Sequence, residues 1–155
     1  MRLTRFSDIG LRVLMYLARE PREIPAVTIA EISSQFDIPR NHLVKVAGLL
    51  AKHGWIAATR GRTGGLRLAV EPASLKLGQV VRVLEGRKEL IDCEQLRCQL
   101  SKDCGLRSAL ARAHDAFYVA LDAYTLADII SGGAGNEISQ MHQGYLAIHL
   151  QNSAA

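Results

Sequence analysis

The feature that most constrains this chain is the placement of its cysteines, because Cys93, Cys98 and Cys104 are its only three and lie within twelve residues. An odd number of thiols cannot close completely into internal disulfides. No signal peptide or long apolar span precedes the cysteine stretch (residues 93–104). We therefore expect a cytoplasmic chain without a membrane segment, in which clustered thiols indicate metal or redox chemistry.

The spacing C-x₄-C-x₅-C favours an iron–sulfur cluster over zinc. Structural zinc sites usually show a tight C-x₂₋₄-C pair and four evident ligands, whereas this stretch offers three. Free thiols in a surface loop are the alternative, although free cysteines are more often dispersed and buried.

Composition supports a folded core and an uneven charge distribution. The 155 residues are 48% hydrophobic, enough for one compact domain or a small domain with an oligomerisation element. Residues 1–70 contain 11 Lys or Arg against 5 Asp or Glu, while residues 71–155 contain 8 against 10. The basic half indicates a surface for a polyanion, although a modest excess of base is weak evidence alone.

Apolar spacing predicts three helices in the first third of the chain, over residues 4–19, 29–36 and 40–53. A capping box formed by Thr28 and Glu31 opens the second helix, and Pro39 starts the third. The short turn between them gives the layout of a helix-turn-helix with a recognition helix. An ordinary helical hairpin is the alternative.

The segment after the third helix favours DNA binding. Residues 55–59 and 66–68 read as two strands around a glycine-rich loop, which predicts a wing. A phosphate-cradling loop would need a helix after it, and a strand follows instead. Arginines at the wing tip are suited to a narrow minor groove. The candidate DNA-binding residues are Thr28, Arg40, Asn41, His42, Lys45, Arg60, Arg62 and Thr63.

Beyond the wing, a helix is expected over residues 77–85, followed by the cysteine stretch and a long helix from residue 106. The long helix repeats apolar residues at intervals of three and four, which favours packing against a second subunit over packing on its own body. The candidate dimerisation residues are Leu106, Leu110, Ala113, Phe117 and Leu121. Thr125 is expected to cap a final turn. The glycine-rich segment 131–135 predicts a flexible break, followed by a flexible tail or a frayed amphipathic helix.

The fold class expected is mainly α with a small β-wing: a winged helix-turn-helix DNA-binding domain with a long dimerisation helix. The boundaries are residues 1–72 for the DNA-binding domain, 73–105 for the connecting helix and cysteine stretch, 106–130 for the dimerisation helix and 131–155 for the tail. A redox enzyme would need catalytic acid and base pairs, which we do not find. An electron carrier would need no basic recognition helix.

Several motifs spread over the chain up to about residue 131 carry a family resemblance: residues 1–8 (MRLTRFSD), 40–46 (RNHLVKV), 60–68 (RGRTGGLRL), 77–85 (LGQVVRVLE), the cysteines and 124–128 (YTLAD). They resemble the NsrR branch of the winged-helix iron–sulfur regulators, which also include IscR. The resemblance implies a homodimeric repressor that holds a [4Fe–4S] cluster, with [2Fe–2S] as the alternative. It implies release from inverted-repeat operator DNA when nitric oxide attacks the cluster.

The resemblance also bears on the fourth cluster ligand. IscR-like members place a histidine three residues after the last cysteine, where this chain has Arg107. NsrR-like members use an aspartate from the first helix of the other subunit, which by motif falls on Asp8. The implied ligands are Cys93, Cys98, Cys104 and Asp8 of the second subunit. From the residues alone, Asp8 and Arg12 stand four apart on a helix and can form a surface ion pair instead. A regulator of the IscR type, which senses cluster supply or oxidation, is the rival function.

Overall fold

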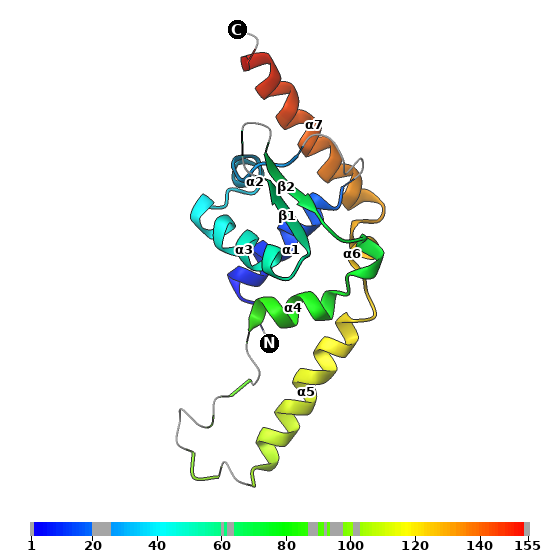
Figure 1. Cartoon of the computed structure of the whole chain (residues 1–155). Helices are drawn as coiled ribbons and strands as arrows, with labels where there is room; N and C mark the ends of the chain where they lie inside the picture. Colours follow the sequence, from blue (N-terminus) through cyan, green and yellow to red (C-terminus); the bar gives the residue numbers. More distant parts are fainter. Residues whose placement is uncertain are drawn as a thin grey trace.

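The computed structural model describes residues 2–19, 26–59, 61, 64–86, 90–91, 93, 98–100 and 103–153. The described chain is mostly helical and has one small antiparallel sheet of two strands (Figure 1). The predicted fold class is therefore confirmed.

Helices α1 (Arg5–Leu17), α2 (Ile29–Phe36) and α3 (Arg40–Lys52) form the helix-turn-helix part. Their boundaries follow from local chemistry, since Thr4 and Thr28 accept backbone N–H groups at the starts of α1 and α2. Asp37 ends α2 in the left-handed conformation, with φ of 50°. The core of this part is fully buried and apolar, with Val13, Leu14, Ile32, Leu43, Val46 and Leu50 at its centre.

Only one of the two hydrogen bonds of the capping box predicted for α2 is formed. The Thr28 hydroxyl accepts from the Glu31 backbone N–H at 3.1 Å, as predicted. The Glu31 carboxylate, however, is buried against Tyr16 and His142. The Glu31 side chain, which the local sequence predicted to cap α2, therefore makes buried hydrogen bonds to distant residues instead.

Strands β1 (Ile56–Thr59) and β2 (Gly65–Leu68) pair in register from Ile56 opposite Leu68 to Thr59 opposite Gly65. Val27 adds a further antiparallel bridge to Leu66. A Cβ at Gly65 would lie 2.7 Å from the Val27 carbonyl oxygen, so the close approach of these segments requires glycine. We call α1 to α3 with β1 and β2 the winged head. The predicted wing-tip residues Arg60, Arg62 and Thr63 lie outside the described residues.

Helix α4 (Leu77–Glu85) follows a 3₁₀ turn, η1 (Pro72–Ser74), and packs against both α1 and α5. Gly10 allows the close approach to α1, because a Cβ there would lie 2.6 Å from Leu84 Cδ1. Gly86 then ends α4 with φ of 61° and turns the chain toward the cysteine stretch. Helix α4 is thus the bridge between the winged head and the rest of the chain.

Helix α5 (Gly105–Leu121) lies near α4 at its C-terminal end, and its N-terminal part extends away from the winged head (Figure 1). His114 and Tyr118 are its buried residues, and both face α4. A Cβ at Gly78 of α4 would lie 2.3 Å from the Tyr118 carbonyl oxygen, so glycine permits this contact. Helix α6 (Leu126–Ile130) begins at a complete capping box of Thr125 and Asp128, where the sequence predicted a cap.

Residues 133–153 form helix α7 where the sequence led us to expect a flexible tail or a frayed amphipathic helix. The helix packs against α1 and α6, and it buries Ile138 and His142 to 7% and 5% exposure. Tertiary burial of these two residues stabilises a segment whose glycines argued for a break. The C-terminal part of α7 extends beyond the winged head (Figure 1).

Candidate nucleic-acid interface and metal centre

The outer face of α3 presents polar side chains to solvent. Arg40, Asn41 and Lys45 are all exposed, and at about 100° per residue they fall within an arc of roughly 140°. The helix is held from behind by the buried residues Leu43 and Val46. Three of the residues predicted to bind DNA therefore lie together on one open surface of a rigid helix.

His42 and Thr28 take different positions. His42 is only partly exposed and lies about 60° around α3 from Lys45, at the edge of the polar face. Thr28 is exposed at the start of α2, where its hydroxyl caps the helix. Its role in holding α2 is thus visible in the structure, while a phosphate contact stays a prediction.

Two residues of this face were missed from the sequence. Val44 is 58% exposed, unusual for a valine, and it lies between Arg40 and Gly48 around the helix. A Cβ at Gly48 would meet nothing within 4 Å, so packing does not require glycine there. An exposed valine suits the methyl group of thymine, and an uncrowded glycine suits close approach of a backbone.

A buried polar network lies behind α2 and joins it to α1 and α7. Glu31 accepts a hydrogen bond from the Tyr16 hydroxyl at 2.8 Å and is bonded to Nδ1 of His142. Nη2 of Arg19 lies 2.8 Å from Nε2 of His142. Because a guanidinium only donates, Nε2 accepts and Nδ1 carries the proton that His142 donates to Glu31. These four side chains are at most 5% exposed, so the network fixes α2 against two other helices.

Burial governs the acid–base behaviour of this network. It raises the pKa of Tyr16, and the hydrogen bond to Glu31 adds to the effect because it favours the protonated phenol. Burial lowers the pKa of Arg19, opposed by the nearby Glu31 charge. The sequence offered no local signal for the network, since Glu31 and His142 are 111 positions apart.

The cysteines lie between the bridge helix α4 and helix α5. Cys93 is buried, while Cys98 and Cys104 are partly exposed. The Cys98 N–H donates to the Cys93 carbonyl at 3.2 Å, so these two backbones adjoin. Cys104 is the N-cap of α5.

The donor chemistry of this stretch fits an iron–sulfur cluster, since clusters are held mainly by thiolates. In the part of the chain that the structure describes, however, no three His, Cys, Asp or Glu side chains are gathered as metal ligands would be. The thiols are therefore suitable donors, and cluster binding requires them to converge further.

Asp8 lies on the exposed side of α1 and is paired in this chain. Nε of Arg12 donates to both carboxylate oxygens at 3.0 Å. The two side chains are 48% exposed for Arg12 and 53% for Asp8, so the pair is weak and can be broken. The surface ion pair that the sequence allowed is thus present, and ligation by Asp8 stays a prediction.

Glu85, the last residue of α4, ties the start of α1 to the beginning of the cysteine stretch. Its Oε1 accepts from the Thr4 backbone N–H at 2.8 Å and from the Thr4 hydroxyl at 3.1 Å. The hydroxyl of Ser7, which is fully buried, donates to the same oxygen. The first turn of α1, which carries Asp8, is therefore fixed next to Gly86, where the chain leaves α4.

Comparison with known proteins identifies the family. Residues 3–132 match the Rrf2 family, described as iron-dependent transcriptional regulators. This chain belongs to the Rrf2 family. The match ends where α7 begins, so the helix that completes the buried network lies outside it. As an Rrf2 protein the chain is a transcription regulator and not an enzyme.

Solved structures share the Rrf2 fold of this chain. CymR, the global cysteine regulator of B. subtilis, has a TM-score of 0.66 at 24% identity over 84% of this chain and 97% of its own. The oxidized form of Staphylococcus aureus CymR has a TM-score of 0.67 at 22% identity over 85% and 98%. T. potens IscR has a TM-score of 0.63 at 25% identity over 84% and 86%.

The predicted dimerisation residues of this Rrf2 protein lie on an open face of α5. Leu106 is 64% exposed and Ala113 is exposed, while Leu110, Phe117 and Leu121 are partly covered. Such a stripe is costly in water and suits a second helix. Val119, 66% exposed, lies on the other side of the helix, about 160° around it from Phe117. Within the described residues, no helix has the length and apolar character to cross a membrane.

Proposed function

We propose that this Rrf2 protein is a homodimeric DNA-binding repressor that senses nitric oxide through a [4Fe–4S] cluster. Reaction of the cluster with nitric oxide releases the protein from operator DNA. The observation that supports this most strongly is the connection between the two candidate sites. The cysteine stretch leaves α4 directly after Glu85, which is bonded to the first turn of the winged head. Its other end is Cys104, the N-cap of α5.

The winged head supplies the DNA contacts in this proposal. Arg40 and Lys45 bind phosphates or guanine edges, Asn41 reads a base, and Val44 packs on a thymine methyl. Two such heads in a two-fold dimer require an inverted repeat whose half-sites lie about one helical turn apart. Arg60, Arg62 and Thr63 of the wing and Thr28 of α2 add backbone or minor-groove contacts.

The cluster ligands in this proposal are Cys93, Cys98 and Cys104 of one subunit and Asp8 of the other. A bound cluster would supply iron that reacts with nitric oxide, and the carboxylate is its weakest protein donor. Asp8 has to break its ion pair with Arg12 to bind the cluster. This is feasible because such an exposed pair stabilises the protein by at most about 1 kcal/mol. Arg107 stands where IscR-like proteins have a histidine ligand, and this favours the aspartate.

Coupling to DNA follows from the rigid parts of the chain. Helix α4 is held to α1 by Glu85 and Leu84, and to α5 by Gly78 and Tyr118. Any change in the path from Cys93 to Cys104 therefore alters the angle between the winged head and α5. Losing simultaneous contact with two half-sites by even about 3–4 kcal/mol lowers affinity by roughly 10²–10³.

Anaerobic operator binding before and after nitric oxide tests the proposal. We expect tight binding by the cluster-loaded dimer and weak binding after nitric oxide, with unchanged far-ultraviolet circular dichroism. Cys93→Ala, Cys98→Ala and Cys104→Ala should each lose the visible absorbance of the cluster. Equal operator affinities before and after nitric oxide would end the nitric oxide assignment and favour sensing of cluster supply or oxidation, as in the IscR type.

Asp8 is tested by a matched pair of variants on the same exposed face of α1. Asp8→Ala should leave a cluster that forms but decays sooner, because one weak ligand is lost. Arg12→Ala removes the same ion pair but keeps the carboxylate, so the cluster lifetime should not fall. Equal shortening in both variants would assign the effect to the ion pair instead.

A further inference from the structure

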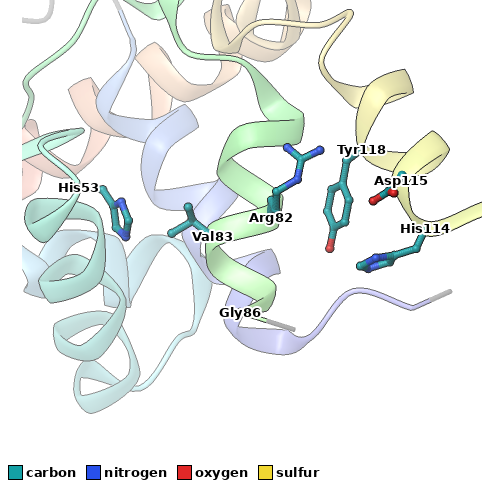
Figure 2. A pocket seen from close by; sticks show the side chains of 7 residues that line it. All are labelled: His53, Arg82, Val83, Gly86, His114, Asp115 and Tyr118. Carbon is teal, nitrogen blue, oxygen red and sulfur yellow. The ribbon is translucent and has the colours of Figure 1, made fainter. Parts of the chain in front are cut away.

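A cavity of about 490 Å³ lies between the end of α3, helix α4 and helix α5. Figure 2 shows the side chains that line it, spread from His53 past Val83 and Arg82 of α4 to the residues of α5. They are His53, Arg82, Val83, Gly86, His114, Asp115 and Tyr118. The volume falls in the range of roughly 300–1,000 Å³ that is typical of small-molecule sites. None of these residues belongs to the DNA-binding face or to the cysteines.

The hydroxyl of Tyr118 is the unusual group in this cavity. Tyr118 is 1% exposed, and its hydroxyl has no hydrogen-bond partner among the described residues. A buried polar group without a partner costs about 1–3 kcal/mol, so a ligand atom that accepts this hydrogen bond would recover that cost. Burial also raises the pKa of Tyr118, which keeps the hydroxyl protonated as a donor. The ring of His114, 7% exposed, lies edge-on to Tyr118 with centroids 4.7 Å apart.

Arg82 supplies a positioned positive charge. Its guanidinium carbon lies 4.5 Å from the centre of the Tyr118 ring, and its Nη1 lies 3.7 Å from Oδ2 of Asp122. The side chain remains 47% exposed, so it has donors left for a ligand. His53 and His114 add two imidazoles, against one lining carboxylate, Asp115. The donors therefore suit an anion with several acceptor oxygens.

We propose that this cavity binds a small organic oxyanion, a carboxylate or a phosphate ester, as an effector independent of the cysteines. The guanidinium of Arg82 and the hydroxyl of Tyr118 donate to the oxyanion, and Val83 packs on the organic part. His53 is the C-cap of α3, whereas Tyr118 belongs to α5. Occupancy therefore links the recognition helix to the dimerisation helix and fixes the angle between them.

The cavity and the stripe of α5 lie on neighbouring sides of the helix. Asp115 lies about 160° around the helix from Phe117, at 100° per residue. His114 and Tyr118 face α4 within the same chain. The cavity and the predicted dimer contact therefore adjoin at Phe117, whose ring centroid lies 5.4 Å from that of Tyr118.

Trp55 provides a direct readout of binding. It is the only tryptophan of the chain, and its ring centroid lies 5.1 Å from that of His53 at the cavity. The full-length protein is titrated with succinate in one arm and inorganic phosphate in the other, at constant ionic strength. We expect saturable quenching or enhancement in at least one arm, and the arm that saturates identifies the class of oxyanion.

Variants decide whether the signal comes from the cavity. Arg82→Gln and Tyr118→Phe should each weaken affinity about tenfold or more, since each removes a donor to the oxyanion. Tyr118→Phe breaks no internal hydrogen bond, so it keeps the test valid if Arg82→Gln folds poorly. Arg112→Gln, an exposed charge on α5 outside the cavity, is the matched control and should bind normally.

The following results would contradict the proposal. No saturation by either probe at millimolar concentration, or equal affinity in Arg82→Gln and Arg112→Gln, would rule out an oxyanion site here. A saturating probe that leaves operator affinity unchanged would refute the effector role. Cys93→Ala should keep probe binding, so a failed cluster assignment and a failed cavity assignment give different results.

Discussion

The winged head and helix α5 are both built on apolar residues at helical spacing, yet one buries them and the other does not. In the winged head Leu14, Leu43 and Leu50 are completely buried. In α5, Leu106 is 64% exposed, and the buried residues are His114 and Tyr118 on the side facing α4. The same sequence pattern thus gives a closed core in one region and an open face in the other.

This difference separates a region that a single chain folds by itself from a region that needs a partner to cover its apolar side chains. The winged head buries its own apolar side chains, and His142 of α7 completes the buried network with Tyr16, Arg19 and Glu31. Helix α5 and the cysteine stretch leave apolar side chains and thiols available to something outside the chain. Substitutions in the head should therefore change folding, and those in α5 should change assembly.

The largest effect is expected from Glu31→Ala in the head. Removing this 1% exposed carboxylate leaves Arg19 buried without its main compensating charge, which should cost about 3–5 kcal/mol of the free energy of unfolding. Asp115→Ala, which removes an exposed carboxylate from α5, should stay within about 0.5 kcal/mol. Urea denaturation followed by Trp55 fluorescence measures both. A loss below 1 kcal/mol in Glu31→Ala would mean that water reaches the network.

A pair of leucine truncations should separate folding from assembly. Leu14→Ala removes a fully buried side chain and should cost about 2–5 kcal/mol in urea denaturation. Leu106→Ala should leave head unfolding within about 0.5 kcal/mol, because its side chain is exposed in the single chain. In sedimentation equilibrium only Leu106→Ala should weaken self-association. A dimer unaffected by Leu106→Ala and by Phe117→Ala would remove α5 as the subunit contact.

Much of the winged head could be predicted from the sequence because its signals are local. Apolar spacing, the Thr28 cap and the turn at Asp37 to Pro39 lie within a few residues of the elements that they define. The buried network could not be predicted, since Glu31 bonds a histidine 111 positions away and an acidic residue can also form a cap. The same holds for Glu85, which lies 81 positions from Thr4.

Some residues of the candidate sites could likewise be predicted from local sequence, and others could not. Arg40, Asn41 and Lys45 were predictable, since helical geometry alone puts them on one face. Val44 falls on that face by the same geometry, whereas the cavity at Tyr118 depends on how whole helices pack, which no local pattern reveals. Convergence of the thiols was predicted from spacing and a family resemblance, and the described residues neither gather them nor oppose it.

Alkaline pH should lower stability through two buried phenols, one in each region. Burial raises the pKa of both Tyr16 and Tyr118, so the folded state keeps the proton that the unfolded state loses. Their stabilising contribution is complete below the ordinary phenol pKa of about 10 and is lost above it, by up to about 1.4 kcal/mol per pH unit for each group. Urea titrations between neutral pH and pH 11 measure the slope.

Phenylalanine variants show which of the two tyrosines causes the loss of stability at alkaline pH. Tyr16→Phe should lower stability at neutral pH, because Glu31 loses a donor, and should flatten the alkaline slope. Tyr118→Phe should flatten the slope without the neutral loss, since its hydroxyl has no partner within the described chain. A slope that both variants leave unchanged would place the titrating groups elsewhere.

A stabilising effect on folding is expected at Gly48, where the head meets its proposed ligand. Gly48→Ala should raise the free energy of unfolding by up to about 1 kcal/mol, because alanine favours a helix interior and its Cβ meets nothing within 4 Å. If DNA approaches α3 here, the same methyl group should weaken operator binding, measured by fluorescence anisotropy at fixed salt. Gly105→Ala, at the start of α5 and equally uncrowded, is the control and should leave operator binding unchanged. A more stable Gly48→Ala protein with unchanged operator affinity would move the DNA away from this part of α3, and the contact would then centre on Arg40 and Asn41 at its first turn.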